Sequence, residues 1–143
     1  MSSKRSDVDA YQLSEQAGFN LRRANQRHVA IFSKLVKGLT PTQFAALARL
    51  NEHGAISQNR LGRLTAMDSA TIKGVVERLK AKGLVLSRSD LKDRRMRLVE
   101  LSDKGRAVFE TELVAALHAR TETLAPLTEE EAKTFEALLS KLV

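Results

Sequence analysis

The sequence contains no cysteine, no long apolar run and no common catalytic motif. Without cysteine, a disulfide scaffold, a thiolate nucleophile, a zinc site with cysteine ligands and a thiol-based redox sensor are all excluded. No apolar stretch approaches the roughly 20 residues that a membrane-spanning helix needs. The first residues also lack the apolar stretch of a signal peptide. We therefore expect a soluble cytoplasmic protein that does not bind a membrane.

Enzymatic motifs are missing as well. The sequence has no glycine-rich phosphate loop, no Gly-x-Ser-x-Gly and no His-Glu-x-x-His. The acidic run from Glu129 to Glu131 is a favourable helix start and is better explained by the helix dipole than by catalysis. His53 and His118 lie in separate segments without spaced acidic partners. We predict neither an enzyme nor a protein with a metal ion or other cofactor.

The charges that are present are unevenly distributed. The chain has 24 basic and 17 acidic residues, a net charge of +7. Residues 57–106 contain 13 basic and six acidic residues, so their excess equals that of the whole chain, whereas residues 107–143 contain three and seven. A basic middle beside an acidic end predicts a polyanionic partner for the middle and a different role for the ends. A solvated basic face is the alternative that charge alone leaves open.

Apolar periodicity and capping signals predict a mainly helical chain. Apolar residues recur at spacings of three and four over 10–37, which predicts one helix about 40 Å long that Gly38 caps. Further helices are expected to begin after five polar residues that suit the N-cap position. These are Thr40, Ser57, Asp68, Ser102 and Thr128.

The middle of the chain predicts a winged helix-turn-helix. Two short helices, joined by a turn at 65–67, precede two strands over 84–88 and 97–101 that enclose a charged loop. The fold class is therefore mainly α with a small β-hairpin wing, flanked by N- and C-terminal helices. The boundaries that we predict are 1–38, 39–105 and 106–143.

The second helix of such a unit enters the major groove and presents its first residues to base edges. Four apolar residues, Ile72, Val75, Val76 and Leu79, are expected to be buried. The opposite face then presents Ser69, Thr71 and Lys73 to bases or phosphates and Arg78 to a phosphate. The two hydroxyls have an alternative role as capping partners of Asp68.

The hairpin is strongly basic. Its cations are Arg88, Lys92, Arg94, Arg95 and Arg97. They are opposed by Asp90 and Asp93, and a narrow minor groove attracts such cations. Asp93 stands two residues before Arg95, so we expect its carboxylate to hold the Arg95 side chain in one rotamer. A loose solubilising loop is the alternative.

Residues 40–105 resemble the MarR (multiple antibiotic resistance regulator) family of bacterial transcription factors. The resemblance rests on three stretches of sequence. These are Leu39-Thr40-Pro41-Thr42-Gln43-Phe44, then Thr71 with Arg78-Leu79 and Gly83-Leu84-Val85, and finally Asp93-Arg94-Arg95 with Val99-Glu100-Leu101-Ser102-Asp103-Lys104-Gly105. The last of these matches the wing signature of the family.

The resemblance implies a homodimer that binds double-stranded DNA. Residues 1–38 and 106–143 would be its dimerisation helices. Arg95 would enter the minor groove with Asp93 orienting it, and Ser69, Thr71 and Lys73 would read the major groove. The preceding helix would contact the DNA backbone through Gln58, Asn59 and Arg60.

The resemblance also implies a pocket for a small aromatic or phenolic acid, between the dimerisation helices and the winged domain, whose occupation weakens operator binding. The candidate residues are Arg23, Arg27, His28 and Phe44, with Arg22 beside them. Arginine binds carboxylates in a bidentate manner, and apolar walls suit an aromatic ring. Alternatively, the arginines face solvent or DNA phosphates and His28 is a core or interface residue. Sensing of oxidants through a cysteine is excluded.

The sequence thus predicts a ligand-responsive transcriptional regulator, a repressor that binds a pseudopalindromic operator as a homodimer and is released by an aromatic carboxylate. An architectural DNA-binding protein of the same fold without an effector is the first alternative. A protein adaptor that uses the basic face for an acidic partner is the second. We expect Asp93 to hold Arg95 in one orientation, and a surface for an acidic protein partner would not need such an arginine, which argues against the adaptor.

Overall fold

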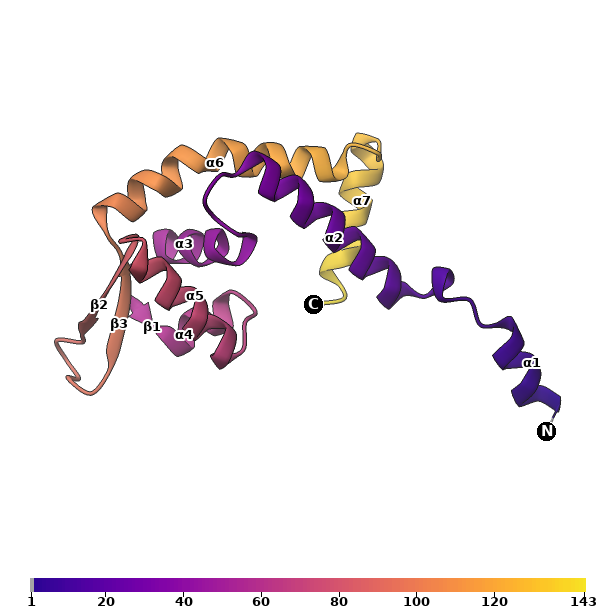
Figure 1. Ribbon diagram of the computed structural model, residues 1–143, viewed down its shortest axis with the longest axis horizontal. Coiled ribbons are helices and arrows are strands. Elements are labelled where there is room, and N and C mark those ends of the chain that lie inside the picture. The colour runs from indigo at the N-terminus through magenta and orange to yellow at the C-terminus, as the bar shows by residue number, and fades with distance from the viewer. Residues whose placement is uncertain (1) are drawn as a thin grey trace.

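The computed structural model describes residues 2–143 and is mainly helical, with one small antiparallel sheet (Figure 1). The elements are α1 (Ser2–Ala10), a 3-10 turn η1 (Leu13–Glu15), α2 (Ala17–Leu35), α3 (Pro41–His53), β1 (Ile56–Ser57), α4 (Gln58–Leu64), α5 (Ser69–Ala81), β2 (Val85–Ser89), β3 (Arg97–Leu101), α6 (Asp103–Leu124) and α7 (Glu129–Ser140). This order confirms the predicted fold class. None of the described helices is long and apolar enough to cross a membrane.

The prediction of one continuous helix over 10–37 is wrong. The backbone is extended at Gln12 and Gln16, so η1 separates α1 from α2. Leu13 and Leu21 carry the helical spacing at this end, yet both are exposed. Most helical stability in proteins comes from packing of the apolar face, and in the part of the chain that the structure describes this end of the face is not covered. The continuous helix is α2, about 28 Å long at 1.5 Å per residue.

The end of the first helix also differs from the prediction. Helix α2 ends at Leu35 with Val36 as its C-cap, so Gly38 lies in the linker to α3 and does not cap the helix. Gly38 has a φ of 80°, a left-handed conformation that favours glycine. The linker turns sharply at this residue and leads into α3.

The five predicted N-caps are confirmed. The hydroxyls of Thr40, Ser57, Ser102 and Thr128 accept hydrogen bonds from backbone N–H groups in the first turns of α3, α4, α6 and α7, and the carboxylate of Asp68 does so in α5. Thr40 with Gln43 and Thr128 with Glu131 form complete capping boxes. Local chemistry alone therefore predicted the starts of the five helices from α3 to α7.

The sheet has three strands in the order β1-β3-β2, one more than the predicted hairpin. Ile56 pairs with Val99 in the added pair, and Val85 pairs with Leu101 in the hairpin. A strand of two residues is too short to show an alternating pattern, and its partner lies more than 40 residues away. The sequence pattern therefore predicts only the two strands of the hairpin and not β1.

One core joins the winged unit to the long helices. Its fully buried side chains include Leu47 of α3, Leu79 of α5 and Val99 of β3, and Phe32 of α2 and Phe109 of α6 pack against the same core. Gly105 lies against the backbone of Leu84, where an added Cβ would overlap the carbonyl oxygen. The first turn of α6 is thereby held close to β2.

The apolar faces of α6 and α7 are largely uncovered in the single chain. Leu113, Leu117, Phe135 and Leu138 are all exposed. Figure 1 shows α6 extending along α2 and away from the winged unit, with α7 folded back beneath its far end. These faces are larger than the winged unit can cover.

Candidate nucleic-acid interface

Helix α5 has two distinct faces. The four apolar residues predicted to be buried, Ile72, Val75, Val76 and Leu79, are buried. The residues predicted to face the DNA, Ser69, Thr71, Lys73 and Arg78, are exposed. The helix thus presents short polar side chains at its start and an arginine further along.

The start of α5 is held by Asp68. Its carboxylate accepts a hydrogen bond from the backbone N–H of Thr71 at 2.7 Å. This bond is the main cause of the lowered pKa of Asp68, and the Thr71 hydroxyl lowers the pKa further. The hydrogen bond that caps the helix thus comes from the Thr71 backbone, and the side chains of Ser69 and Thr71 are exposed.

Helix α4 brings its candidates close to the start of α5. Asn59 and Arg60 are exposed and Gln58 is half-buried. Asn59 and Ser69 line the same hollow of about 190 Å³ between the two helices. Ala66, with a φ of 55°, makes the turn tight enough for this approach. The structure thus brings the two predicted groups together on one surface.

The wing is formed by β2 and β3 and the loop between them, and Figure 1 shows it beside α4 and α5, with its base at the start of α6 and its tip pointing away from α6. The prediction that Asp93 holds the Arg95 side chain is wrong. The Asp93 carboxylate accepts a hydrogen bond from the backbone N–H of Arg95 at 3.1 Å, and the Asp93 carbonyl accepts one from the Met96 N–H. In a tight turn, a short acidic side chain readily accepts a hydrogen bond from the backbone N–H two residues later. A bond to the end of the long Arg95 side chain is harder to form. Asp93 therefore shapes the tip of the wing.

The cations of the wing differ in their surroundings. Arg88 forms an ion pair with Glu100 across β2 and β3, with Nε 3.3 Å from the carboxylate. Within the described residues no ion pair engages Lys92, Arg94, Arg95 or Arg97. Leu91, at the tip of the wing, is 91% exposed. The sequence analysis did not identify this residue as a candidate. Four cations are thus available to an anionic partner, and Arg88 is already paired.

Two of the candidate ligand residues, Arg27 and His28, contact the end of α6 from α2. The Arg27 guanidinium donates to the carbonyls of Thr123 at 2.6 Å and Glu122 at 2.9 Å, and His28 Nδ1 lies 2.8 Å from the Thr123 hydroxyl. The last carbonyls of a helix have no partner within it, so Arg27 stabilises the end of α6. The sequence could not show this contact, because it joins residues almost 100 positions apart.

Aromatic rings fill the space next to His28. Phe44 lies against Phe109, with ring centroids 5.2 Å apart, and edge-on to Phe32 at 5.9 Å. Arg23 lies over the ring of Phe19 at 5.7 Å and is exposed. Phe32 thus lies between His28 and Phe44 and connects these two candidates, whereas Arg23 lies on the surface of α2.

Comparison with known proteins gives consistent matches. The MarR family model matches residues 39–96. The HTH-type transcriptional repressor NicR of Pseudomonas putida is 40% identical over 139 residues, which cover 96% of this chain and 88% of NicR.

Two solved structures are similar over almost the whole chain. A probable transcriptional regulator from Pseudomonas aeruginosa is 53% identical with a TM-score of 0.90, covering 92% of this chain and 100% of that one. BpsR of Bordetella bronchiseptica, whose DNA binding is regulated by 6-hydroxynicotinic acid, is 42% identical with a TM-score of 0.88, covering 92% and 96%.

Proposed function

The chain belongs to the MarR family of transcriptional regulators, and from this membership we propose that it is a repressor. It binds a pseudopalindromic operator as a homodimer and is released by a small aromatic carboxylic acid. The observation that carries the proposal is that α5 and the neighbouring wing both expose polar groups: α5 exposes Ser69, Thr71 and Lys73, and the wing exposes arginines that, apart from Arg88, form no ion pair within the described residues. The protein acts in the cytoplasm, where its operator DNA would be.

The homodimer is supported by the uncovered apolar faces of α6 and α7. Exposed apolar patches of this extent mark protein–protein interfaces. A second copy offers an identical face, and two-fold pairing would give two recognition helices for two half-sites. The acidic C-terminal third would then lie away from the DNA.

On the DNA, Arg95 enters the minor groove from the wing, while Ser69, Thr71 and Lys73 face the major groove. The remaining candidates contact the DNA backbone. They are Gln58, Asn59, Arg60, Arg78, Arg94 and Arg97. Arg88 and Asp93 support the wing, one through Glu100 and the other through the loop backbone.

The effector class is proposed from BpsR and from the residues around α2. BpsR responds to a hydroxylated pyridine carboxylic acid, which combines a flat ring with a carboxylate. His28 lies next to the ring of Phe32, which packs against Phe44. Arg23 offers a cation on the surface of the same helix, over the ring of Phe19. Arg27, bonded to the end of α6, would orient this side of the site and connect it to the dimerisation helices.

The test is binding of the promoter upstream of its own gene, by fluorescence anisotropy, with and without 6-hydroxynicotinic acid. We expect the acid to weaken binding roughly five- to 150-fold, the usual range of allosteric coupling, and the uncharged amide of the same ring to have little effect. Arg23→Gln should reduce the response to the acid. The matched control Lys34→Gln removes an exposed cation from the same helix and should leave the response unchanged.

Each alternative has its own outcome. If operator binding is specific but no aromatic acid alters it, the protein is an architectural DNA-binding protein and the effector proposal fails. If the protein does not distinguish duplex DNA from an acidic polypeptide, the adaptor function replaces the repressor.

A further inference from the structure

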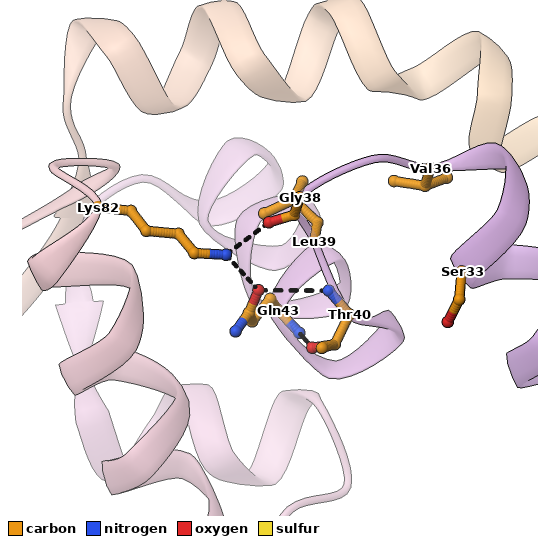
Figure 2. Close-up of a pocket in the computed structure, with 7 residues that line it drawn as sticks. All are labelled: Ser33, Val36, Gly38, Leu39, Thr40, Gln43 and Lys82. Carbon is orange, nitrogen blue, oxygen red and sulfur yellow. Dashed lines mark hydrogen bonds between the residues drawn. The ribbon is translucent and has the colours of Figure 1, made fainter.

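The side chain of Lys82 connects the end of the recognition helix to the linker that follows α2 (Figure 2). Lys82 is the C-cap of α5. Its ammonium group donates to the carbonyl of Gly38 at 2.5 Å and to the side-chain oxygen of Gln43 at 3.1 Å. We refer to these two contacts as the Lys82 bridge.

Gln43 gives the bridge a fixed acceptor. This side chain is polar yet only 5% exposed. Its Oε1 also accepts a hydrogen bond from the backbone N–H of Thr40 at 3.2 Å, as part of the capping box that begins α3. A buried carbonyl oxygen with two donors has no freedom to move without losing one of them. The start of α3 and the end of α5 are therefore held at one atom.

The backbone of Lys82 makes a third contact. Its carbonyl accepts a hydrogen bond at 2.9 Å from the ammonium group of Lys104, which lies in the first turn of α6. Helix α5 otherwise packs chiefly against α3, α4 and β2. Lys82 thus joins the recognition helix both to the linker after α2 and to the start of α6.

The bridge lies beside two clefts that are open to solvent. An open cleft of about 350 Å³ lies beside it, with Val36, Leu39 and Gln43 in its wall. A second cleft of about 450 Å³ shares Leu39 and Lys82 and extends to Val108 of α6. At this open edge of the core, the hydrogen bonds of Lys82 connect α5 directly to the linker after α2 and to the start of α3.

We propose that Lys82 is a positioning residue that fixes the recognition helix relative to α2 and α6, and so fixes the distance between the two recognition helices of the dimer. The inference rests on the proposed homodimer. Lys82 lies at the opposite end of α5 from Ser69, about 20 Å along a helix of this length. It acts through the helix and does not contact the bases.

The test compares variants on operators whose half-sites are separated by the natural spacing or by one or two base pairs more or less. Lys82→Met keeps the length of the side chain and removes the donor. We expect it to bind the natural operator more weakly and the altered operators relatively better, so that the preference for natural spacing falls roughly two- to thirtyfold. Lys82→Arg retains two donors and should restore the preference.

Lys80→Met is the matched control, since it removes an exposed cation from the same end of the same helix. It should keep the wild-type preference for natural spacing. The salt dependence of binding is measured in parallel. If Lys82→Met weakens all operators equally and lowers the salt slope, Lys82 contacts phosphate and the positioning role is overturned.

Two further outcomes separate this inference from the proposed function. An unchanged spacing preference in Lys82→Met, with a clear preference in the wild type, overturns the inference and leaves the dimeric repressor intact. A wild-type protein that binds single half-sites as well as pairs overturns the dimer and the inference with it. If Lys82→Met does not fold, Lys104→Met removes the contact to α6 and should shift the spacing preference in the same direction.

Discussion

At the scale of single residues, Asp93 shows how a correct spacing led to a wrong contact. The two-residue separation from Arg95 indicated a local interaction, and there is one, but it joins the carboxylate to the backbone N–H. The Arg95 side chain is left exposed at the wing, with no ion pair among the described residues. The turn therefore fixes the backbone of Arg95, and the exposed guanidinium is available to enter a DNA groove.

Replacing Arg95 tests the wing directly. Arg95→Ala should cost about 1–3 kcal/mol of operator affinity if the guanidinium is inserted in a minor groove. Arg95→Lys keeps the charge but loses the planar group, so it should recover only part of the loss. Anisotropy titrations on the operator and on a scrambled duplex measure both effects. Full binding by Arg95→Ala would remove the wing from the interface.

At the scale of elements, the helix starts are the best-determined part of the molecule. Each of the five predicted N-caps makes the expected hydrogen bond, since an N-cap needs only one acceptor near its own helix. Two of these starts involve carboxylates. The backbone N–H of Thr71 lowers the pKa of Asp68, and that of Thr128 lowers the pKa of Glu131.

These two lowered pKa values predict a loss of stability in acid. The folded state favours the ionised carboxylates, so their contribution is present above the ordinary values of 3.8 and 4.5 and is lost as the pH falls through the lower folded values. Asp68→Asn with Glu131→Gln keeps both caps without a charge. Urea unfolding at about pH 6 and about pH 3 should show a smaller loss in this double variant than in the wild type.

Glu110→Gln is the control, because it neutralises a carboxylate in the middle of α6, outside any cap. Its loss of stability between the two pH values should match that of the wild type. An equal loss in the double variant would mean that acid acts through other groups.

At the scale of the whole molecule, the basic and the acidic residues are concentrated on different elements. The excess of basic residues in 57–106 falls on α4, α5 and the wing, and the acidic residues of 107–143 fall on α6 and α7. Figure 1 shows these two groups on different sides of the molecule. In the proposed dimer each protomer would bring a basic surface to the DNA.

Operator binding should therefore depend steeply on salt. A dimer that neutralises roughly six to ten phosphates loses about 10³–10⁵ in affinity between 50 and 200 mM salt. Arg78→Gln should reduce the slope of log affinity against log salt by about two, one phosphate per protomer. Lys133→Gln, on α7, should leave it unchanged. A flat titration of the wild type would contradict a phosphate-binding surface.

The sequence by itself determined the fold class, the starts of the five helices from α3 to α7 and the two faces of α5. These features depend on contacts within a few residues or on a simple period, such as the burial of Ile72 and Val75 opposite Lys73. The resemblance to the MarR family rested on the same local motifs. The basic candidates of the wing were also found in this way.

Only the tertiary structure decided which distant residues meet. It paired Ile56 with Val99, placed Arg27 on the end of α6 and brought Lys82 to Gln43. It also interrupted the predicted first helix at Gln12, whose neighbours Tyr11 and Leu13 are both exposed. No local pattern determines such contacts, because their energy depends on atoms that are brought together only when the chain is folded.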